Sequence, residues 1–274
     1  MASLRLNEIT TESVSAYVAR RQSEKMAISS VNRELQVLRR ILNVAVEWGA
    51  LESTIKVKLL TGEARRERVI SPDEERRYLA AAPEPLASVA TVLVDSGLRP
   101  EECFRMLWEN INFSAGKYGS LFVTHGKTAA ARRMLPLSPR VQLILRTRWE
   151  AANKPYEGGV WPAPTASGHV EPSTLKKPHA KVFKTIADNL KGKEKPVRPF
   201  VLYLLRHTFL TRLGESGCDV WTLARIAGHG SIAMSNRYVH PGNDAVMDAM
   251  LKFGGHNFGH SDTQAVLEIG TERS

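Results

Sequence analysis

The chain has 274 residues, enough for two domains, and its hydrophobic content of 43% is that of a globular protein rather than a disordered one. No apolar run approaches the roughly 20 residues that span a bilayer, the first residues lack a secretory leader, and the two cysteines are too few for a disulfide framework. The formal net charge of +10 suits a polyanionic partner such as nucleic acid.

Residues 10–48 predict two helices. In the second, apolar residues recur at spacings of four, three, four and three, the pattern of an amphipathic helix: Val31, Leu35, Leu38, Leu42 and Ala45. Its polar face carries Arg33, Arg39 and Arg40, which either face solvent or bind phosphate groups. From residue 52 to 68 the periodicity is lost, and we interpret this basic, polar stretch as a linker.

A longer region follows. One helix begins after Ser71, which is suited to cap it, and a buried helix ends at Gly97. Residues 121–123 and 134–136 predict two short strands around a turn. Further helices are expected at about 138–151, at about 178–190, and on to Tyr238.

These elements predict a mainly α fold with a small antiparallel β-sheet (α+β). We expect a small helical domain at 1–62, a larger domain at 68–253 and a polar tail at 254–274. In the tail, His256 and His260 are four residues apart, but neighbouring glycines disfavour a helix and no further ligands are apparent. The sequence therefore predicts no metal site and no cofactor.

Two basic residues in the middle of the chain could act on a phosphate group. Arg99 lies between a helix-ending glycine and a helix-opening proline, where backbone N–H groups favour an anion, and Glu102 is near enough to orient it. A surface salt bridge would explain this pair equally well. Lys127 lies in the predicted turn, where it could donate a proton or simply face solvent. It is not part of a nucleotide-binding loop, because residue 121 is a leucine and not the required glycine.

The segment from Arg206 to Tyr238 contains the groups that a phosphodiester cut without metal would need. Guanidinium groups pair with phosphate oxygens, an imidazole donates or accepts a proton, and a tyrosine hydroxyl can attack phosphorus. Arg206 and His207 lie beside the apolar face of one predicted helix, His229 follows the end of the next, and Tyr238 ends a short helix. Taken singly, each also has a structural explanation, such as a capping histidine or a buried tyrosine.

Taken together, these motifs resemble the tyrosine recombinases, the phage-integrase-like enzymes of site-specific DNA recombination. Ser96 to Arg99 with Glu102 resembles the family's first arginine box, and Gly126-Lys127-Thr128 resembles its hairpin lysine. Leu205 to Phe209 resembles the second arginine box. Ala227 to His229 resembles the histidine box, and Tyr238 follows His229 at the usual separation of nine residues.

The resemblance covers residues 68–253 strongly. Residues 10–50 are similar to the second half of the family's helical core-binding (SAM-like) domain, so this DNA-binding domain is expected to be incomplete. One departure is plain: the second box usually begins with a histidine three residues before the arginine, where this chain has Tyr203. A tyrosine hydroxyl can donate a hydrogen bond but is a poor proton acceptor at neutral pH.

The resemblance implies a recombinase that cuts and rejoins double-stranded DNA without metal or cofactor, through a 3′-phosphotyrosyl intermediate. Its catalytic residues would be Arg99, Lys127, Arg206, His229 and Tyr238, supported by Glu102, Tyr203 and His207. It would act as a homo-oligomer, a dimer on one site and a tetramer in the synapse, in the cytoplasm at the nucleoid and with no membrane partner. Two alternatives stay open: a DNA-binding protein that has lost cleavage (a decayed integrase or a regulator), and a type IB topoisomerase-like relaxase.

Overall fold

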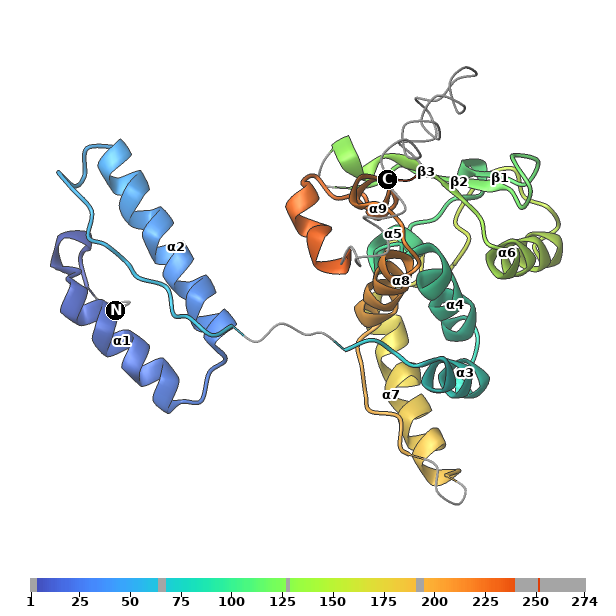
Figure 1. Cartoon of the computed structure of the whole chain (residues 1–274), viewed down its shortest axis with the longest axis horizontal. Helices are drawn as coiled ribbons and strands as arrows, with labels where there is room; N and C mark the ends of the chain where they lie inside the picture. The colour runs from blue at the N-terminus through green and yellow to red at the C-terminus, as the bar shows by residue number, and fades with distance from the viewer. Residues whose placement is uncertain (1–3, 64–67, 127–128, 191–194, 240–250, 252–274) are drawn as a thin grey trace, which may run out of the picture. The chain divides into compact units, whose positions relative to one another are not determined.

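The computed structural model describes residues 4–63, 68–126, 129–190, 195–239 and 251. The chain divides into two compact units, residues 1–67 and 68–274 (Figure 1). None of the described helices is long and apolar enough to cross a membrane.

The first unit is a pair of helices joined by a short turn. α1 runs over Thr11–Ser23 and α2 over Ile28–Glu47, after a single 3-10 turn at Leu6–Glu8. α1 starts where it does because the Thr10 side chain accepts a hydrogen bond from the Ser13 backbone N–H, and the Ser13 hydroxyl accepts one from that of Thr10. The predicted apolar stripe of α2 is buried against α1.

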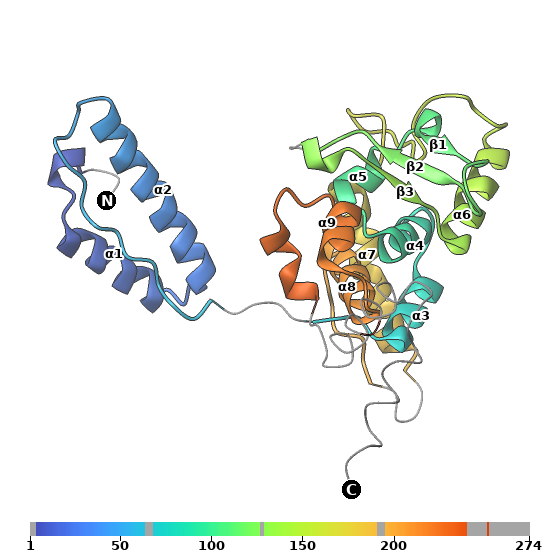
Figure 2. The same ribbon diagram turned by 45° about the horizontal axis from the view of Figure 1, so that its top comes forward.

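The stretch interpreted as a linker is in part a structural strap. Residues 51–60 run along the helix pair in extended form (Figure 2), and Val57 is buried in the hydrophobic cluster that α1 and α2 form. Asn32 on α2 holds the strap: its amide nitrogen donates to the Leu60 carbonyl (2.9 Å) and its oxygen accepts from the Leu60 N–H (2.8 Å). The sequence did not predict the packing of this strap, because its apolar residues follow no helical period and lie among basic ones.

The second unit is mainly helical with one small sheet, which confirms the predicted fold class. Its helices are α3 (Pro72–Ala81), α4 (Leu86–Ser96), α5 (Pro100–Phe104), α6 (Pro139–Ala151), α7 (Pro172–Asp188), α8 (Tyr203–Glu215) and α9 (Val220–Ala227). The antiparallel sheet has the order β1 (Ile111–Asn112), β2 (Ser120–Val123) and β3 (Arg133–Pro136). Single 3-10 turns lie at Trp108–Asn110, Ala129–Ala131, Ile232–Met234 and Asn236–Tyr238.

Three details differ from the expectation. β1 was not foreseen, since two residues give no periodic signal. α7 begins at Pro172, six residues before the expected start, and Pro178 lies inside it. The segment that leads to Tyr238 is two 3-10 turns rather than one helix, because Ser235 ends the first turn and begins the second.

The core of the second unit is built around α4. Its side chains are buried on all sides, including Val89, Val92 and Leu93, because α3, α5, α6, α7 and α8 pack around it. α8 lies along α4 in both views (Figures 1 and 2). The carboxyl end of α4, the start of α8 and the end of α9 thereby meet, and these ends carry the candidate site.

Candidate active site

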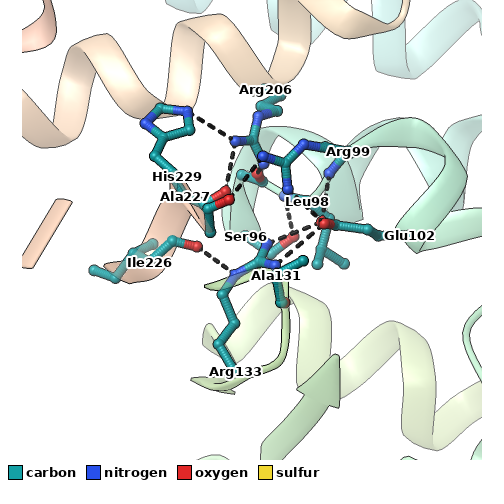
Figure 3. Close-up of polar contacts among 12 residues, drawn as sticks. Ser96, Leu98, Arg99, Glu102, Ala131, Arg133, Arg206, Ile226, Ala227 and His229 are labelled. Carbon is teal, nitrogen blue, oxygen red and sulfur yellow. Dashed lines mark hydrogen bonds and ion pairs between the residues drawn. The ribbon is translucent and has the colours of Figure 1, made fainter. Parts of the chain in front are cut away.

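Arg99 lies at the start of α5, with about a third of its side chain exposed (32%). Its backbone N–H donates to Glu102 Oε2 (2.9 Å), and its Nη1 donates to Oε1 of the same carboxylate (2.7 Å). Its Nη2 donates to the Gly228 carbonyl at the end of α9 (2.8 Å; Figure 3). Two bonds, one to α5 and one to the end of α9, therefore fix this guanidinium, and the bond to the carboxylate is charge-assisted and so among the stronger kind.

Glu102 is buried and bound by a second arginine, Arg133 on β3, which sequence reasoning missed. Arg133 Nη2 donates to Glu102 Oε2 (2.9 Å) and Nη1 to Oε1 (3.2 Å), while its Nε donates to the Ile226 carbonyl of α9 (2.7 Å). Burial by itself would raise the pKa of Glu102, but the hydrogen bonds and charge of Arg133, together with the hydrogen bonds from Arg99, hold that pKa below its ordinary value. The carboxylate thus stays ionised and ties the sheet to the arginine cluster (Figure 3).

Arg206 on α8 is completely buried. Nη1 donates to the Gly97 carbonyl and Nη2 to the Ala227 carbonyl, each at 2.6 Å. Its Nε has no hydrogen-bond partner among the described residues. Burial, and then repulsion from Arg99, lower the pKa of Arg206 to about 10, so it is still a cation at neutral pH. A buried cation bonded only to neutral groups favours the approach of an anion.

His229 follows Gly228, which ends α9 in the left-handed conformation (φ +62°) that glycine adopts without strain. Its Nε2 is 3.2 Å from Arg206 Nη2, and its Nδ1 is 2.7 Å from the hydroxyl of the fully buried Ser235. Burial, then the charges of Arg206 and Arg99, lower the pKa of His229 to about 4. The ring is therefore neutral at pH 7, with Nε2 facing a donor and Nδ1 facing the serine oxygen.

Tyr238 is buried beneath this cluster, with 3% of its surface exposed. Its ring lies nearly parallel to that of His229, with the centroids 6.3 Å apart. Its hydroxyl accepts a hydrogen bond from Arg237 Nη2 (2.8 Å) and is 3.4 Å from Nδ1 of His207. Burial and the charge of Arg237 lower the pKa of His207 from its ordinary value.

The structure thus brings together Arg99, Glu102, Arg206, His207, His229 and Tyr238 out of the predicted set. Tyr203 opens α8 but is 46% exposed, and it makes no hydrogen bond to a site residue in the described part of the chain. Lys127 lies outside the described residues. Arg33, Arg39 and Arg40 belong to the other unit.

Sequence reasoning missed Arg133, Ser235 and Arg237. Arg237 could have been noticed as the cation next to the candidate nucleophile. Arg133 gave no signal, because it acts through contacts with segments far apart in sequence, and Ser235 gave none, because a serine six residues after a histidine matches no recognised motif. Within the described residues, no three His, Cys, Asp or Glu side chains gather in a way that could hold a metal ion.

Comparisons with known proteins give matches along most of the chain. The model of the phage integrase family matches residues 68–244. A Sinorhizobium fredii protein, y4eF, provisionally named an integrase/recombinase, is 28% identical over 224 residues, which are 79% of this chain and 80% of that protein. The tyrosine recombinase XerD of Lacticaseibacillus casei is 25% identical over 239 residues, 81% of this chain and 75% of that protein.

Solved structures share the fold. The Tn1549 transposon integrase (residues 82–397), in complex with circular intermediate DNA, superposes with a TM-score of 0.71 at 15% sequence identity. The superposition covers 90% of this chain and 87% of that one.

Proposed function

Because the chain belongs to the phage integrase family, we propose that it cuts and rejoins double-stranded DNA through a covalent bond between Tyr238 and a 3′-phosphate. The observation that carries this proposal is Arg206, a fully buried guanidinium beside His229 that is held by two backbone carbonyls and has, in the part of the chain that the structure describes, only neutral hydrogen-bond partners.

The two arginines supply the charge that a phosphoryl transfer needs. Arg206 is fixed by two carbonyls and Arg99 by Glu102, so neither side chain has to reorganise when negative charge grows on the non-bridging oxygens. In a poorly solvated site such preorganised cations stabilise a transition state far more than they would in water. His229 would complete the set beside Arg206: its Nε2 accepts from Arg206 Nη2 in the free protein, and it can donate to the same phosphate only when the ring carries a proton on that nitrogen. These groups can act without a metal ion.

The covalent chemistry assigns one role to each remaining residue. Tyr238 Oη attacks phosphorus, the P–O5′ bond breaks, and Lys127 protonates the departing 5′-oxygen. The phosphotyrosyl bond conserves the energy of the phosphodiester, so that a 5′-hydroxyl of a partner strand can attack it and restore the DNA without ATP. Glu102 orients Arg99, and Tyr203 is available as a hydrogen-bond donor at the place of the family's histidine.

The first unit would serve as a DNA-binding domain on the same substrate. Arg33, Arg39 and Arg40 are all exposed, but Arg39 donates to the Val57 carbonyl of the strap and Arg40 to Glu47 Oε1 (3.2 Å), so Arg33 is the strongest candidate for a phosphate contact. We propose that the protein works as a dimer on each site and a tetramer in the synapse, on DNA of the nucleoid.

The test is trapping of the covalent intermediate. DNA bound by the purified protein would first be recovered from a random library and sequenced, and a nicked suicide substrate built from it would be incubated with the protein in EDTA. We expect an adduct on a denaturing gel that is absent in Tyr238→Phe, although that variant still binds the DNA.

Other outcomes point to other functions. Binding without any adduct from the full-length protein would contradict the enzyme proposal and favour a DNA-binding protein that no longer cuts. An adduct that persists in Tyr238→Phe would remove that residue as the nucleophile. Relaxation of a supercoiled plasmid without any recombinant product would favour a topoisomerase-like activity.

A further inference from the structure

The hydroxyl of Tyr238 has two polar neighbours that the proposed function does not use. Arg237 Nη2 donates to it at 2.8 Å, and the guanidinium lies over the tyrosine ring at 4.8 Å from its centroid. Since a guanidinium can only donate, the phenol proton has to point elsewhere. Nδ1 of His207, at 3.4 Å, is its other polar neighbour among the described residues.

Resting on the function proposed above, we propose that His207 accepts the proton of Tyr238 during DNA cleavage and that Arg237 stabilises the phenolate as it forms. His207 would then be a catalytic residue, because it touches the attacking oxygen. It would fill the role left open by a tyrosine at position 203.

The geometry of α8 supports this exchange of roles. Residues 203 and 207 are one helical turn apart and share a face, with Cβ atoms of such pairs about 5–6 Å from each other. Tyr203 is exposed and has no hydrogen bond to another site residue within the described ranges, whereas His207 is partly buried and in contact with the Tyr238 ring, 5.3 Å between centroids. On this face of α8, residue 207 rather than residue 203 is therefore the one that reaches the Tyr238 hydroxyl.

The protonation state of His207 also fits. Burial, then repulsion from Arg237, keep the pKa of His207 below its ordinary value, so the ring is neutral and able to accept a proton at neutral pH. The charged and titratable groups that act on it or contact it within the described residues are Arg237 and Tyr238, both on the last 3-10 turn. Arg206 precedes it on α8, and on α4, which packs against α8, Asp95 is already paired with Arg140 of α6.

The step balances without a further reactant. The O–H bond of Tyr238 breaks and its proton moves to Nδ1 of His207, the Oη–P bond forms, and the P–O5′ bond breaks as the 5′-oxygen takes a proton from the general acid. In ligation the imidazolium returns its proton to Oη when the phosphotyrosyl bond breaks.

The decisive variant is His207→Asn. The asparagine oxygen can accept the same hydrogen bond as Nδ1 but cannot take up the proton, so a merely structural role would survive the change. We expect adduct formation at saturating protein to slow by about 10²-fold or more, in the range of general base catalysis, with unchanged DNA affinity. His207→Ala should respond to added imidazole with a faster reaction. His169→Asn, far from the site and bonded to the Val170 carbonyl, is the matched control.

Three further readouts decide the proposal. Wild-type cleavage should rise as pH increases through the lowered pKa of His207, and His207→Asn should lose that rise. Adding Tyr203→His to His207→Asn should restore part of the cleavage rate. A substrate whose 5′-oxygen is replaced by sulfur, a better leaving group, should not restore the cleavage rate of His207→Asn, because that variant lacks the base and not the acid. Equal adduct rates for wild type and His207→Asn would overturn the role of His207 alone, whereas no adduct from the wild type would overturn it together with the proposed function.

Discussion

At the scale of single residues, the site depends on one carboxylate shared by two arginines. Glu102 holds Arg99 by its backbone and side chain and also pairs with Arg133, which is as deeply buried as the carboxylate itself. Arg133 reaches α9 through the Ile226 carbonyl, so this one residue ties β3, α5 and α9 together. The hairpin of β2 and β3 is thereby linked to Arg99, the arginine proposed to bind phosphate.

We expect Glu102→Gln to cost about 3–5 kcal/mol of unfolding free energy, because it leaves the buried charge of Arg133 without its partner. The pKa of Glu102 is lowered in the folded state, so its contribution is present above the ordinary carboxyl pKa and is lost as pH falls through the folded value. The difference in unfolding free energy between wild type and Glu102→Gln should therefore become smaller at low pH. Chemical denaturation at pH 7 and at low pH measures it.

Glu101→Gln is the matched control for this measurement. Glu101 lies on the same short helix but is exposed, and it faces Arg105 at 3.9 Å. Its loss should change stability by less than about 0.5 kcal/mol. Equal effects of the two substitutions would mean that the buried pair contributes nothing beyond a surface one.

At the scale of elements, the position of Tyr238, the proposed nucleophile, depends on how closely α8 and the last 3-10 turn approach each other. Gly214 near the end of α8 lies against the last 3-10 turn, and a Cβ added there would come 1.8 Å from the Tyr238 carbonyl oxygen. That contact is with backbone, so no side chain can swing aside to relieve it. We expect Gly214→Ala to displace Tyr238, to destabilise the protein by about 1–3 kcal/mol and to abolish adduct formation.

The comparison variant is Gly159→Ala, at a position where an added Cβ meets nothing within 4 Å and the backbone is not in the left-handed region. It should keep wild-type stability and adduct yield. Full activity of Gly214→Ala would show that the close approach of α8 to Tyr238 is not needed for the reaction.

Elements and motifs differ in how far the sequence could predict them. The stripe of α2 and the buried α4 were predictable because period and composition are local properties. Arg99 and Glu102 could be paired in advance, since they are three residues apart on one short helix. Arg133 could not be joined to Glu102, nor Val57 to the helix pair, because those contacts depend on how distant segments pack.

Tyr203 is a further example of a position whose contacts the sequence could not predict. The order of motifs places residue 203 where the family has a histidine, and from sequence alone it is the natural substitute. Only the packing of α8 against the last turn shows that His207 and Arg237, and not Tyr203, contact the Tyr238 hydroxyl. Sequence patterns can identify which residue is unusual, but they cannot show which neighbour is close enough to replace it.

At the scale of the whole molecule, the net charge of +10 predicts how DNA binding responds to salt. Each phosphate neutralised by a Lys or Arg releases counterions, so log K falls with log salt at a slope of about 0.9 for each contact on duplex DNA. With Tyr238→Phe, which forms no covalent bond, we expect affinity to fall by about 10³-fold or more between 50 and 200 mM salt, as for six or more contacts. Titrations by fluorescence anisotropy would measure it.

A high salt concentration also distinguishes non-covalent DNA binding from the covalent reaction of the wild-type protein. Wild-type protein that has reacted with the suicide substrate should stay attached to the DNA in high salt, because salt does not break a covalent phosphotyrosyl bond. The Tyr238→Phe complex should dissociate, because salt screens the ionic contacts that hold it. A wild-type complex that dissociates as readily as the variant would mean that no covalent bond had formed. If the DNA affinity of Tyr238→Phe did not change with salt concentration, the Lys and Arg side chains would not contact the phosphate backbone.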